Sequence, residues 1–240
     1  MTGYFTPASF KFLKDLKRNN NREWFEKNKP RYEAQLKQPC LNFITDLAAP
    51  LQKISREYVA SPKPVGGSLF RIYRDARFSS DKSPYKTHAG MSFFHDVAKA
   101  TARASASNGM IGRLDAPVFY LHLEPGSCFI GGGIWHPQAD TLKRVRNYMI
   151  ANPASWKKAS RSPAFRKNFT LGGDALSRPP QGYDPSHELI EDLKRKDFVC
   201  SAPLSEAQVC APDFLKNALR HFSTAAPLMD WLCGALDLDF

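Results

Sequence analysis

VFYLHLEPGSCFIGGGIW, residues 118–135, is the stretch that decides the fold. Apolar and polar side chains alternate from Val118 to Leu123, which predicts a strand with one buried face. The turn formers of residues 124–127 follow, and the run from Cys128 to Trp135 is again rich in branched and aromatic residues. The stretch therefore predicts an antiparallel β-hairpin. Gly131–Gly133 lacks the spacing of a phosphate-binding glycine loop, so we expect a bulge or a close approach of two backbones there.

Two more runs of this kind precede the hairpin, from Leu69 to Arg74 and from Ala89 to His95. No long helical pattern separates successive strands, which favours antiparallel over parallel pairing. Residues 97–113 are small, polar and weakly patterned, and we expect a loop or a marginal helix there. The sequence thus predicts one α+β domain over residues 1–240, with a central, mainly antiparallel sheet and helices from both chain ends packed around it.

Helical periodicity covers both ends of the chain. Thr6-Pro7 predicts the start of a first helix, Asn20 with Glu23 resembles a capping box for a second, and a third is expected to begin near Pro39. Asp140 is expected to cap a helix that turns Leu142, Val145 and Met149 inward and Lys143, Arg144 and Arg146 outward. The remaining helices are expected to begin at Pro153 and Pro163 and to span residues 187–196 and 212–236, with a loop over residues 171–183.

The composition bounds the class of protein. The chain has 240 residues, of which 42% are hydrophobic and 24% charged, and this is typical of a globular protein. No run approaches the roughly 18–20 apolar residues of a membrane span, and the opening residues lack the apolar segment of a signal peptide. We therefore expect a cytoplasmic protein with no membrane partner. Five scattered cysteines form no CxxC pair or zinc spacing, so we expect reduced, mostly buried thiols and no metal site.

The formal net charge of +11 is unevenly spread along the chain. Nine basic residues stand against Asp174 alone between Lys143 and Arg178, whereas the last forty residues carry a net charge of −3. A surface polarised in this way attracts nucleic acids and phosphorylated ligands. Binding of nucleic acid through the Lys143–Arg178 region is therefore one hypothesis for the function, and a solvated basic helical face is the simpler interpretation.

The densest polar motif is RIYRDARFSSDKSPYKTH, residues 71–88. It contains more cations than carboxylates, and guanidinium groups give planar, bidentate contacts to phosphate or carboxylate. If a strand runs through the motif, its period of two places Phe70, Ile72 and Arg74 on the half-buried face. Arg74 then needs a partner, and Asp81 is the expected one.

The opposite face of that strand predicts a site for an anionic, phosphate-bearing small molecule. Tyr120 and His122 of the hairpin join it if the two strands share a sheet, and His122 suits proton transfer near neutral pH. Asp75 can orient an arginine or act as a base. The expected ligand-binding residues are Arg71, Tyr73, Arg77, Lys82, Lys86 and Tyr120, and the expected catalytic residues are Asp75 and His122.

An alternative interpretation of the motif remains open. Interlocked Arg–Asp pairs can pin a strand to a loop, which makes the motif a structural brace in a structural or partner-binding domain. The sequence carries no GxSxG elbow, no HExxH motif and no dinucleotide fingerprint, so it identifies no reaction and predicts no cofactor.

The pattern RxxRDxRFxxDKxPYK, met here from Arg71 to Lys86, resembles the signature of a bacterial family, domain of unknown function 2461. The segments NNNREWFEKNKPRYE, FYLHLEPGSCFIGGGIWHP and PQGYDPSHELIEDLKRKDF also look like that family, so the resemblance covers nearly the whole chain. It implies a compact α+β domain and no reaction, because the family is uncharacterised. Residues 97–113 depart from the family pattern by their greater length.

Overall fold

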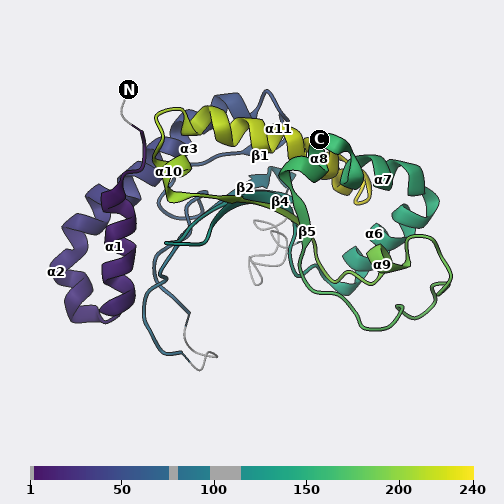
Figure 1. Ribbon diagram of the computed structural model, residues 1–240, viewed down its shortest axis with the longest axis horizontal. Coiled ribbons are helices and arrows are strands. Elements are labelled where there is room, and N and C mark those ends of the chain that lie inside the picture. Colours follow the sequence, from purple (N-terminus) through teal and green to yellow (C-terminus); the bar gives the residue numbers. More distant parts are fainter. Residues whose placement is uncertain (1–2, 76–80, 98–114) are drawn as a thin grey trace.

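The computed structural model describes residues 3–75, 81–97 and 115–240. Its secondary structure consists of a six-stranded antiparallel sheet and helices that come from both ends of the chain (Figure 1). The predicted α+β class with a mainly antiparallel sheet is confirmed. Among the described residues, no helix is both long enough and apolar enough to cross a membrane. The strands are β1 (Tyr58–Val59), β2 (Ala89–His95), β3 (Val118–Leu123), β4 (Cys128–Ile134), β5 (Thr170–Gly172) and β6 (Phe198–Leu204).

The helices before the sheet form a long helical run. Thr6 precedes α1, and Pro7 occupies its first position as predicted. The cap of the second helix is Asn21 rather than Asn20, since the Asn21 side chain accepts the amide of Trp24 at 2.9 Å. Pro39 has no N–H to continue an α-helix, and a π-helical turn leads directly into the third helix. The elements are α1 (Pro7–Arg18), α2 (Arg22–Tyr32), η1 (Glu33–Lys37) and α3 (Gln38–Leu51).

The helices after the hairpin follow the predicted proline boundaries closely. Pro153 and Pro163 each open a helix. Gln138 rather than Asp140 is the cap of the first of these helices, and Asp140 lies in its first turn. The expected helix over residues 187–196 shrinks to one turn. The elements are α6 (Ala139–Ala151), α7 (Pro153–Arg161), α8 (Pro163–Asn168), α9 (Ile190–Leu193), α10 (Glu206–Cys210) and α11 (Phe214–Gly234).

The strand order in the sheet is β1-β2-β3-β4-β6-β5, and every pairing is antiparallel. The hairpin of β3 and β4 is confirmed with its turn at residues 124–127. No strand was predicted over β6, and its Pro203 is of a type that disfavours a central strand. Pro203 lies beyond the three β6 residues that pair with β5, so this part of β6 has β4 as its sheet neighbour.

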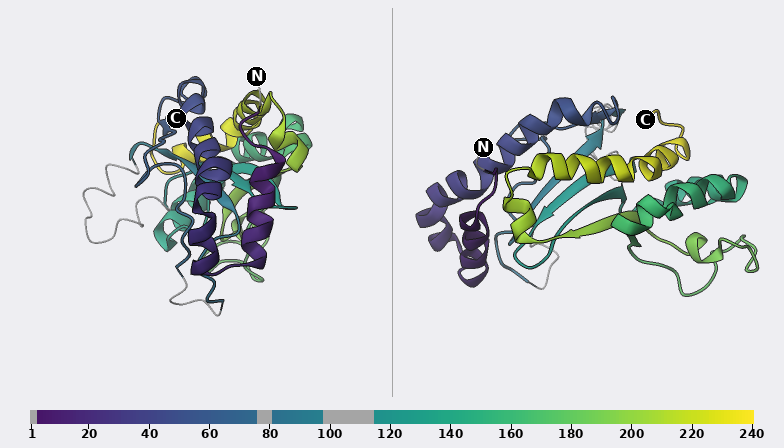
Figure 2. Two further views of the ribbon diagram at one scale, coloured as in Figure 1. Left: turned by 90° about the vertical axis from the view of Figure 1, so that its left-hand side faces the viewer. Right: turned by 45° about the horizontal axis from the view of Figure 1, so that its top comes forward.

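One face of the sheet is buried under helices. Phe93 and Phe119 contact Phe222 of α11 with ring centroids 5.6 and 4.9 Å apart. Burial alternates along β3, so Phe119 and Leu121 lie in the core whereas Tyr120 and His122 are half-buried on the other face. Figure 2 shows α11 and α3 running along the sheet on the covered side. The half-buried face is therefore where strand side chains can meet a ligand.

The glycines of β4 allow the close backbone approach that their position predicted. A Cβ on Gly131 would lie 1.9 Å from the carbonyl oxygen of Cys200, and one on Gly133 would lie 2.0 Å from that of Phe198. No side chain fits at either place, because β6 passes there. These glycines serve the packing of the sheet.

The predicted strand from Leu69 to Arg74 is wrong as a regular strand. The segment follows the strand β2 edge with isolated bridges Leu69–Met91 and Tyr73–Tyr85. Between these two bridges the segment advances by four residues, from Leu69 to Tyr73, whereas its partner spans six, from Tyr85 to Met91. This mismatch interrupts the regular pairing and the alternation of side chains between the two faces. The side chains of this segment therefore contact two different regions of the molecule.

Candidate functional site

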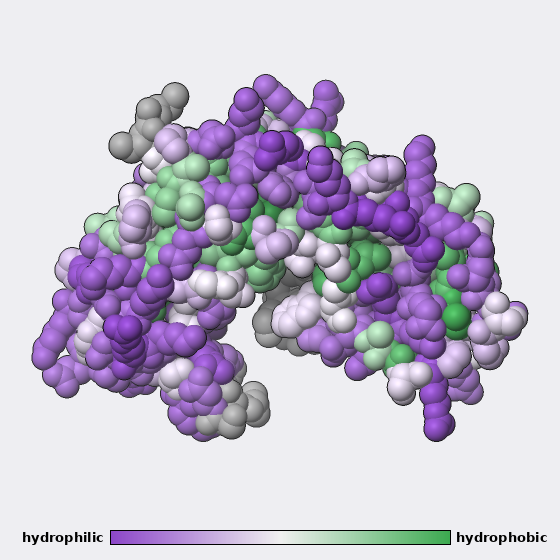
Figure 3. Space-filling view, in the orientation of Figure 1, coloured by the Kyte–Doolittle hydropathy of each residue, from purple (hydrophilic) through white to green (hydrophobic). Residues whose placement is uncertain are grey.

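A cavity of about 460 Å³ lies between α2 and the polar motif. This volume is in the range of small-molecule pockets, which is roughly 300–1,000 Å³. The surface around α2, at the left-hand end of Figure 3, is predominantly hydrophilic. The residues that line the cavity are Arg22, Glu26, Tyr73, Arg74, Lys82, Pro84 and Tyr85.

Aromatic stacking fixes the inner wall of the cavity. Tyr85 is buried and stacks on Phe25 of α2 with ring centroids 4.1 Å apart. Tyr73 packs against both rings and keeps 51% of its surface exposed. Asn20 holds the backbone of Tyr85 in place, because its side chain accepts the amide of Tyr85 at 3.1 Å and donates to its carbonyl at 2.9 Å. Burial raises the pKa of Tyr85, so its hydroxyl stays protonated.

The electrostatics of the lining favour an anion. Arg22, Arg74 and Lys82 face Glu26, which already lies 3.8 Å from the Lys29 amine. Among the residues that the structure describes, Arg22 has no ion-pair partner. A cation that lines a pocket and has no ion-pair partner of its own is available to a negatively charged ligand.

The predicted partner of Arg74 is present. Its guanidinium forms an ion pair with Asp81 and donates to the Ser83 hydroxyl at 3.2 Å. Asp81 also accepts the Ser83 amide at 2.9 Å, and hydrogen bonds from Ser83 followed by the Arg74 guanidinium lower the pKa of the Asp81 carboxyl. One Arg–Asp pair of the motif therefore lies beside the cavity, and it is solvent-exposed.

A second cluster surrounds Tyr120 and His122 on the half-buried face of the sheet. The Tyr120 hydroxyl lies 3.1 Å from Nδ1 of His122, and Nε2 of His122 lies 3.2 Å from Oε2 of Glu124. His88 packs against His122 with ring centroids 4.5 Å apart. Burial, with a smaller contribution from His122, lowers the pKa of His88 to about 4, so its imidazole is neutral at pH 7. Burial, with a smaller contribution from Glu124, raises the pKa of Tyr120 to about 12.

The structure divides the predicted site residues between these two places. Tyr73 and Lys82 line the cavity, whereas Tyr120 and His122 belong to the sheet cluster. Tyr120 is not among the residues that line the cavity with Tyr73: Phe70, which directly precedes the motif, packs near Tyr120 with ring centroids 6.1 Å apart. The irregular pairing of residues 69–73 causes this, since it shifts the alternation that the prediction assumed.

The other predicted residues lie around the sheet cluster or at the surface. The Lys86 amine sits 5.3 Å from the centre of the Phe70 ring, and burial together with the nearby Arg71 lowers the pKa of Lys86. Arg71 and Asp75 are exposed, and Arg77 lies outside the described residues.

Several residues of these clusters were not assigned a role from the sequence. Arg22 and Glu26 belong to α2, which is distant from the motif in the sequence, and no sequence pattern indicates that they lie beside it. His88 belongs to the motif, and Glu124 lies two positions after His122, so the period of two along β3 was a usable signal for the pair.

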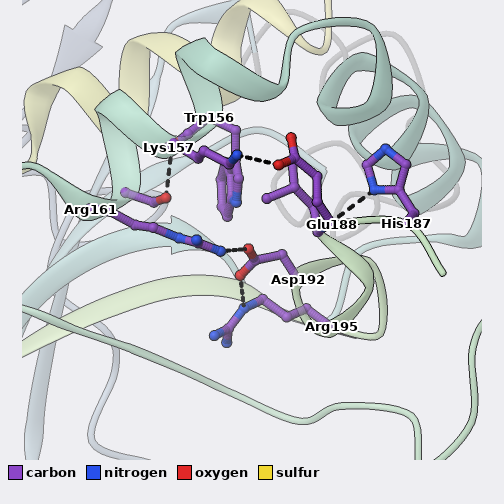
Figure 4. A network of polar contacts seen from close by, with 9 residues as sticks. Trp156, Lys157, Arg161, His187, Glu188, Asp192 and Arg195 are labelled. Carbon is purple, nitrogen blue, oxygen red and sulfur yellow. Dashed lines mark hydrogen bonds and ion pairs between the residues drawn. The ribbon is translucent and has the colours of Figure 1, made fainter. Parts of the chain in front are cut away.

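The basic Lys143–Arg178 region is partly neutralised by acids from elsewhere in the chain. Figure 4 shows Lys157 with Glu188 and Arg161 with Asp192, at 2.5 Å in both cases. Arg144 pairs with Asp237. The five basic residues of the region that are not among these partners or buried are Lys143, Lys158, Arg166, Lys167 and Arg178.

Arg146 corrects the expectation that it faces outward. It is 9% exposed and donates to the carbonyls of Leu193 and Arg195 at 2.8 and 2.9 Å. The guanidinium thereby satisfies carbonyls at the end of α9, which a shorter side chain cannot reach.

One comparison with known proteins, the match to a family model, agrees with the sequence resemblance. A search of curated proteins finds no match. The family model described as "Conserved hypothetical protein (DUF2461)" matches residues 8–231, which is nearly the whole chain and includes both the cavity and the sheet cluster. The chain belongs to the DUF2461 family, whose function is unknown.

Proposed function

We propose that the protein binds a phosphate-bearing small molecule in the cavity between α2 and the polar motif. The observation that carries this proposal is the position of Arg22, which lines a cavity of about 460 Å³ and has no ion-pair partner among the described residues. Arg74 and Lys82 add positive charge to the same lining.

The cavity offers two kinds of contact to such a ligand. The three cations suit phosphate oxygens, because charge-assisted hydrogen bonds are about twice as strong as neutral ones. The Tyr73 and Tyr85 rings offer an apolar wall for the organic part of the ligand. The Arg74–Asp81 pair fixes the Arg74 guanidinium, so less side-chain entropy is lost on binding.

A thermal-shift screen of inorganic phosphate, pyrophosphate, sugar phosphates and nucleotides tests the proposal. A ligand at 100 times its Kd stabilises the native state by about 2.7 kcal/mol. For a chain of this size that corresponds to a rise in Tm of about 5–10 °C. Arg22→Gln and Lys82→Gln are each expected to weaken the best ligand about tenfold, which is the loss of one charge-assisted hydrogen bond.

Lys27→Gln is the matched control, because Lys27 carries the same charge on the same helix but pairs with Glu23 at 2.8 Å, away from the cavity lining. Its affinity is expected to equal that of the wild type. The proposal is wrong if no anion in the screen stabilises the protein, or if Lys27→Gln loses as much affinity as Arg22→Gln.

A further inference from the structure

Three metal-binding side chains converge on the half-buried face of the sheet. His88 directly precedes β2, and His122 and Glu124 lie two positions apart at the end of β3. Gly90 pairs with His122 in the register, so position 88 comes opposite position 124 across the two strands. One nitrogen of each histidine and one oxygen of Glu124 all lie within 4.8 Å of one another.

The contacts around His122 hold its imidazole with Nε2 toward Glu124. The Tyr120 hydroxyl lies 3.1 Å from Nδ1, and Phe129 stacks on the imidazole with ring centroids 4.7 Å apart. Gly90 leaves room for that hydroxyl, because a Cβ there would lie 2.5 Å from it. Metal-binding histidines almost always hold their second nitrogen in such a hydrogen bond.

The spacing of the His122 and Glu124 donor atoms also fits a metal ion. Ligands about 2.0–2.1 Å from a tetrahedral ion lie about 3.3 Å from one another. Nε2 of His122 and Oε2 of Glu124 are 3.2 Å apart. All three side chains are half-buried, so water solvates them less than it does surface residues.

We propose that His88, His122 and Glu124 bind a divalent first-row transition metal ion, and that Tyr120 positions His122 for it. Two imidazoles and one carboxylate suit Zn²⁺, Fe²⁺ and Co²⁺. Three protein ligands leave coordination positions open, and the nearby Lys86 and Arg71 favour an anion there. This site corrects the expectation of no metal site, which rested on the cysteine spacings and gave His88 and Glu124 no role.

Titration of the full chain with Co²⁺ and Zn²⁺ tests the metal site without any knowledge of the reaction. The protein is first treated with a chelator, and binding is then followed by calorimetry and by the visible absorption of Co²⁺. We expect one ion per chain. Glu124→Gln keeps the size of the side chain and its place in the hairpin, and it is expected to weaken binding at least about 100-fold, more than the 10- to 100-fold typical of outer-shell changes.

Tyr120→Phe removes only the positioning hydroxyl and is expected to weaken binding about tenfold. His136→Asn is the matched control, because His136 is exposed, lies outside the cluster and has a positive φ that asparagine tolerates. Its affinity should equal that of the wild type, and circular dichroism verifies the fold of each variant. The proposal is overturned if the wild type binds no stoichiometric ion, or if Glu124→Gln and His122→Gln bind it as tightly as the wild type. The phosphate screen is run on chelated protein, so the two proposals fail independently.

Discussion

Replacement of Asp197 by alanine is expected to destabilise the protein severely, because this buried carboxylate ties two loops to the sheet. Asp197 is 1% exposed and directly precedes β6. Its Oδ1 accepts the His136 amide at 2.7 Å, and its Oδ2 accepts the Asp174 amide at 2.8 Å. These amides belong to the chain after β4 and after β5, so one side chain joins both connections.

The magnitude follows from the two amides that Asp197→Ala leaves without an acceptor. Each unsatisfied buried group costs about 1–3 kcal/mol, and we expect a total loss of about 3–4 kcal/mol. This is a large part of the roughly 5–15 kcal/mol that stabilises a typical domain. Tm should fall by about 6–16 °C at this chain length. Asp197→Asn keeps one oxygen for one of the two amides and should lose about half as much.

Urea unfolding followed by tryptophan fluorescence and circular dichroism measures these losses. Asp237→Asn is the control, because the Asp237 carboxylate is 92% exposed, its ion pair with Arg144 is worth less than about 1 kcal/mol, and asparagine tolerates the positive φ of this position. If Asp197→Ala unfolds at the same urea concentration as Asp237→Asn, the tie between the loops is not a source of stability and the reasoning is refuted.

Three further predictions follow from the corrected contacts. Asp81→Ala should leave the midpoint of urea titrations nearly unchanged, because its pair with Arg74 is solvent-exposed; a midpoint that falls as far as that of Asp197→Ala would support the structural brace instead. Arg146→Met should cost about 2–4 kcal/mol in the same titrations, since two carbonyls lose their donor, and an unchanged midpoint would contradict the buried role. Any DNA binding by the Lys143–Arg178 region should show a log–log salt slope no steeper than about −4.5 in anisotropy titrations, as about five phosphate contacts allow; a steeper slope would point to a dedicated nucleic-acid surface.

Local patterns predicted the regular parts of the fold. Strand β3 begins and ends where the alternation of residues does, β2 has the bounds of the predicted run from Ala89 to His95, and Pro7, Pro153 and Pro163 mark helix starts. These features depend on residues that are close in the sequence, and so the sequence predicts them. Strand β6 was not predicted. Its Pro203 is tolerated because β5 ends before it, and this depends on the tertiary structure.

The candidate site could be predicted only in part, because some of its contacts are local in the sequence and others are not. The Arg74–Asp81 pair lies within one loop, and the sequence predicted it. Arg22 reaches the motif through the packing of α2 on Tyr85, and the register of β2 with β3 brings His88 to Glu124. Both arrangements join segments that are distant in the chain. The break in pairing between Leu69 and Tyr73 then separated residues that a regular strand would have kept on one face.

The most direct test of the anion-binding proposal is a crystal structure of the protein soaked with tungstate, a phosphate analogue whose anomalous signal locates it without ambiguity. We expect tungstate within hydrogen-bond distance of the Arg22 and Lys82 side chains, and its loss from crystals of Arg22→Gln. Tungstate found only at surface lysines, or a cavity that stays free of the anion at saturating concentration, would contradict the proposal.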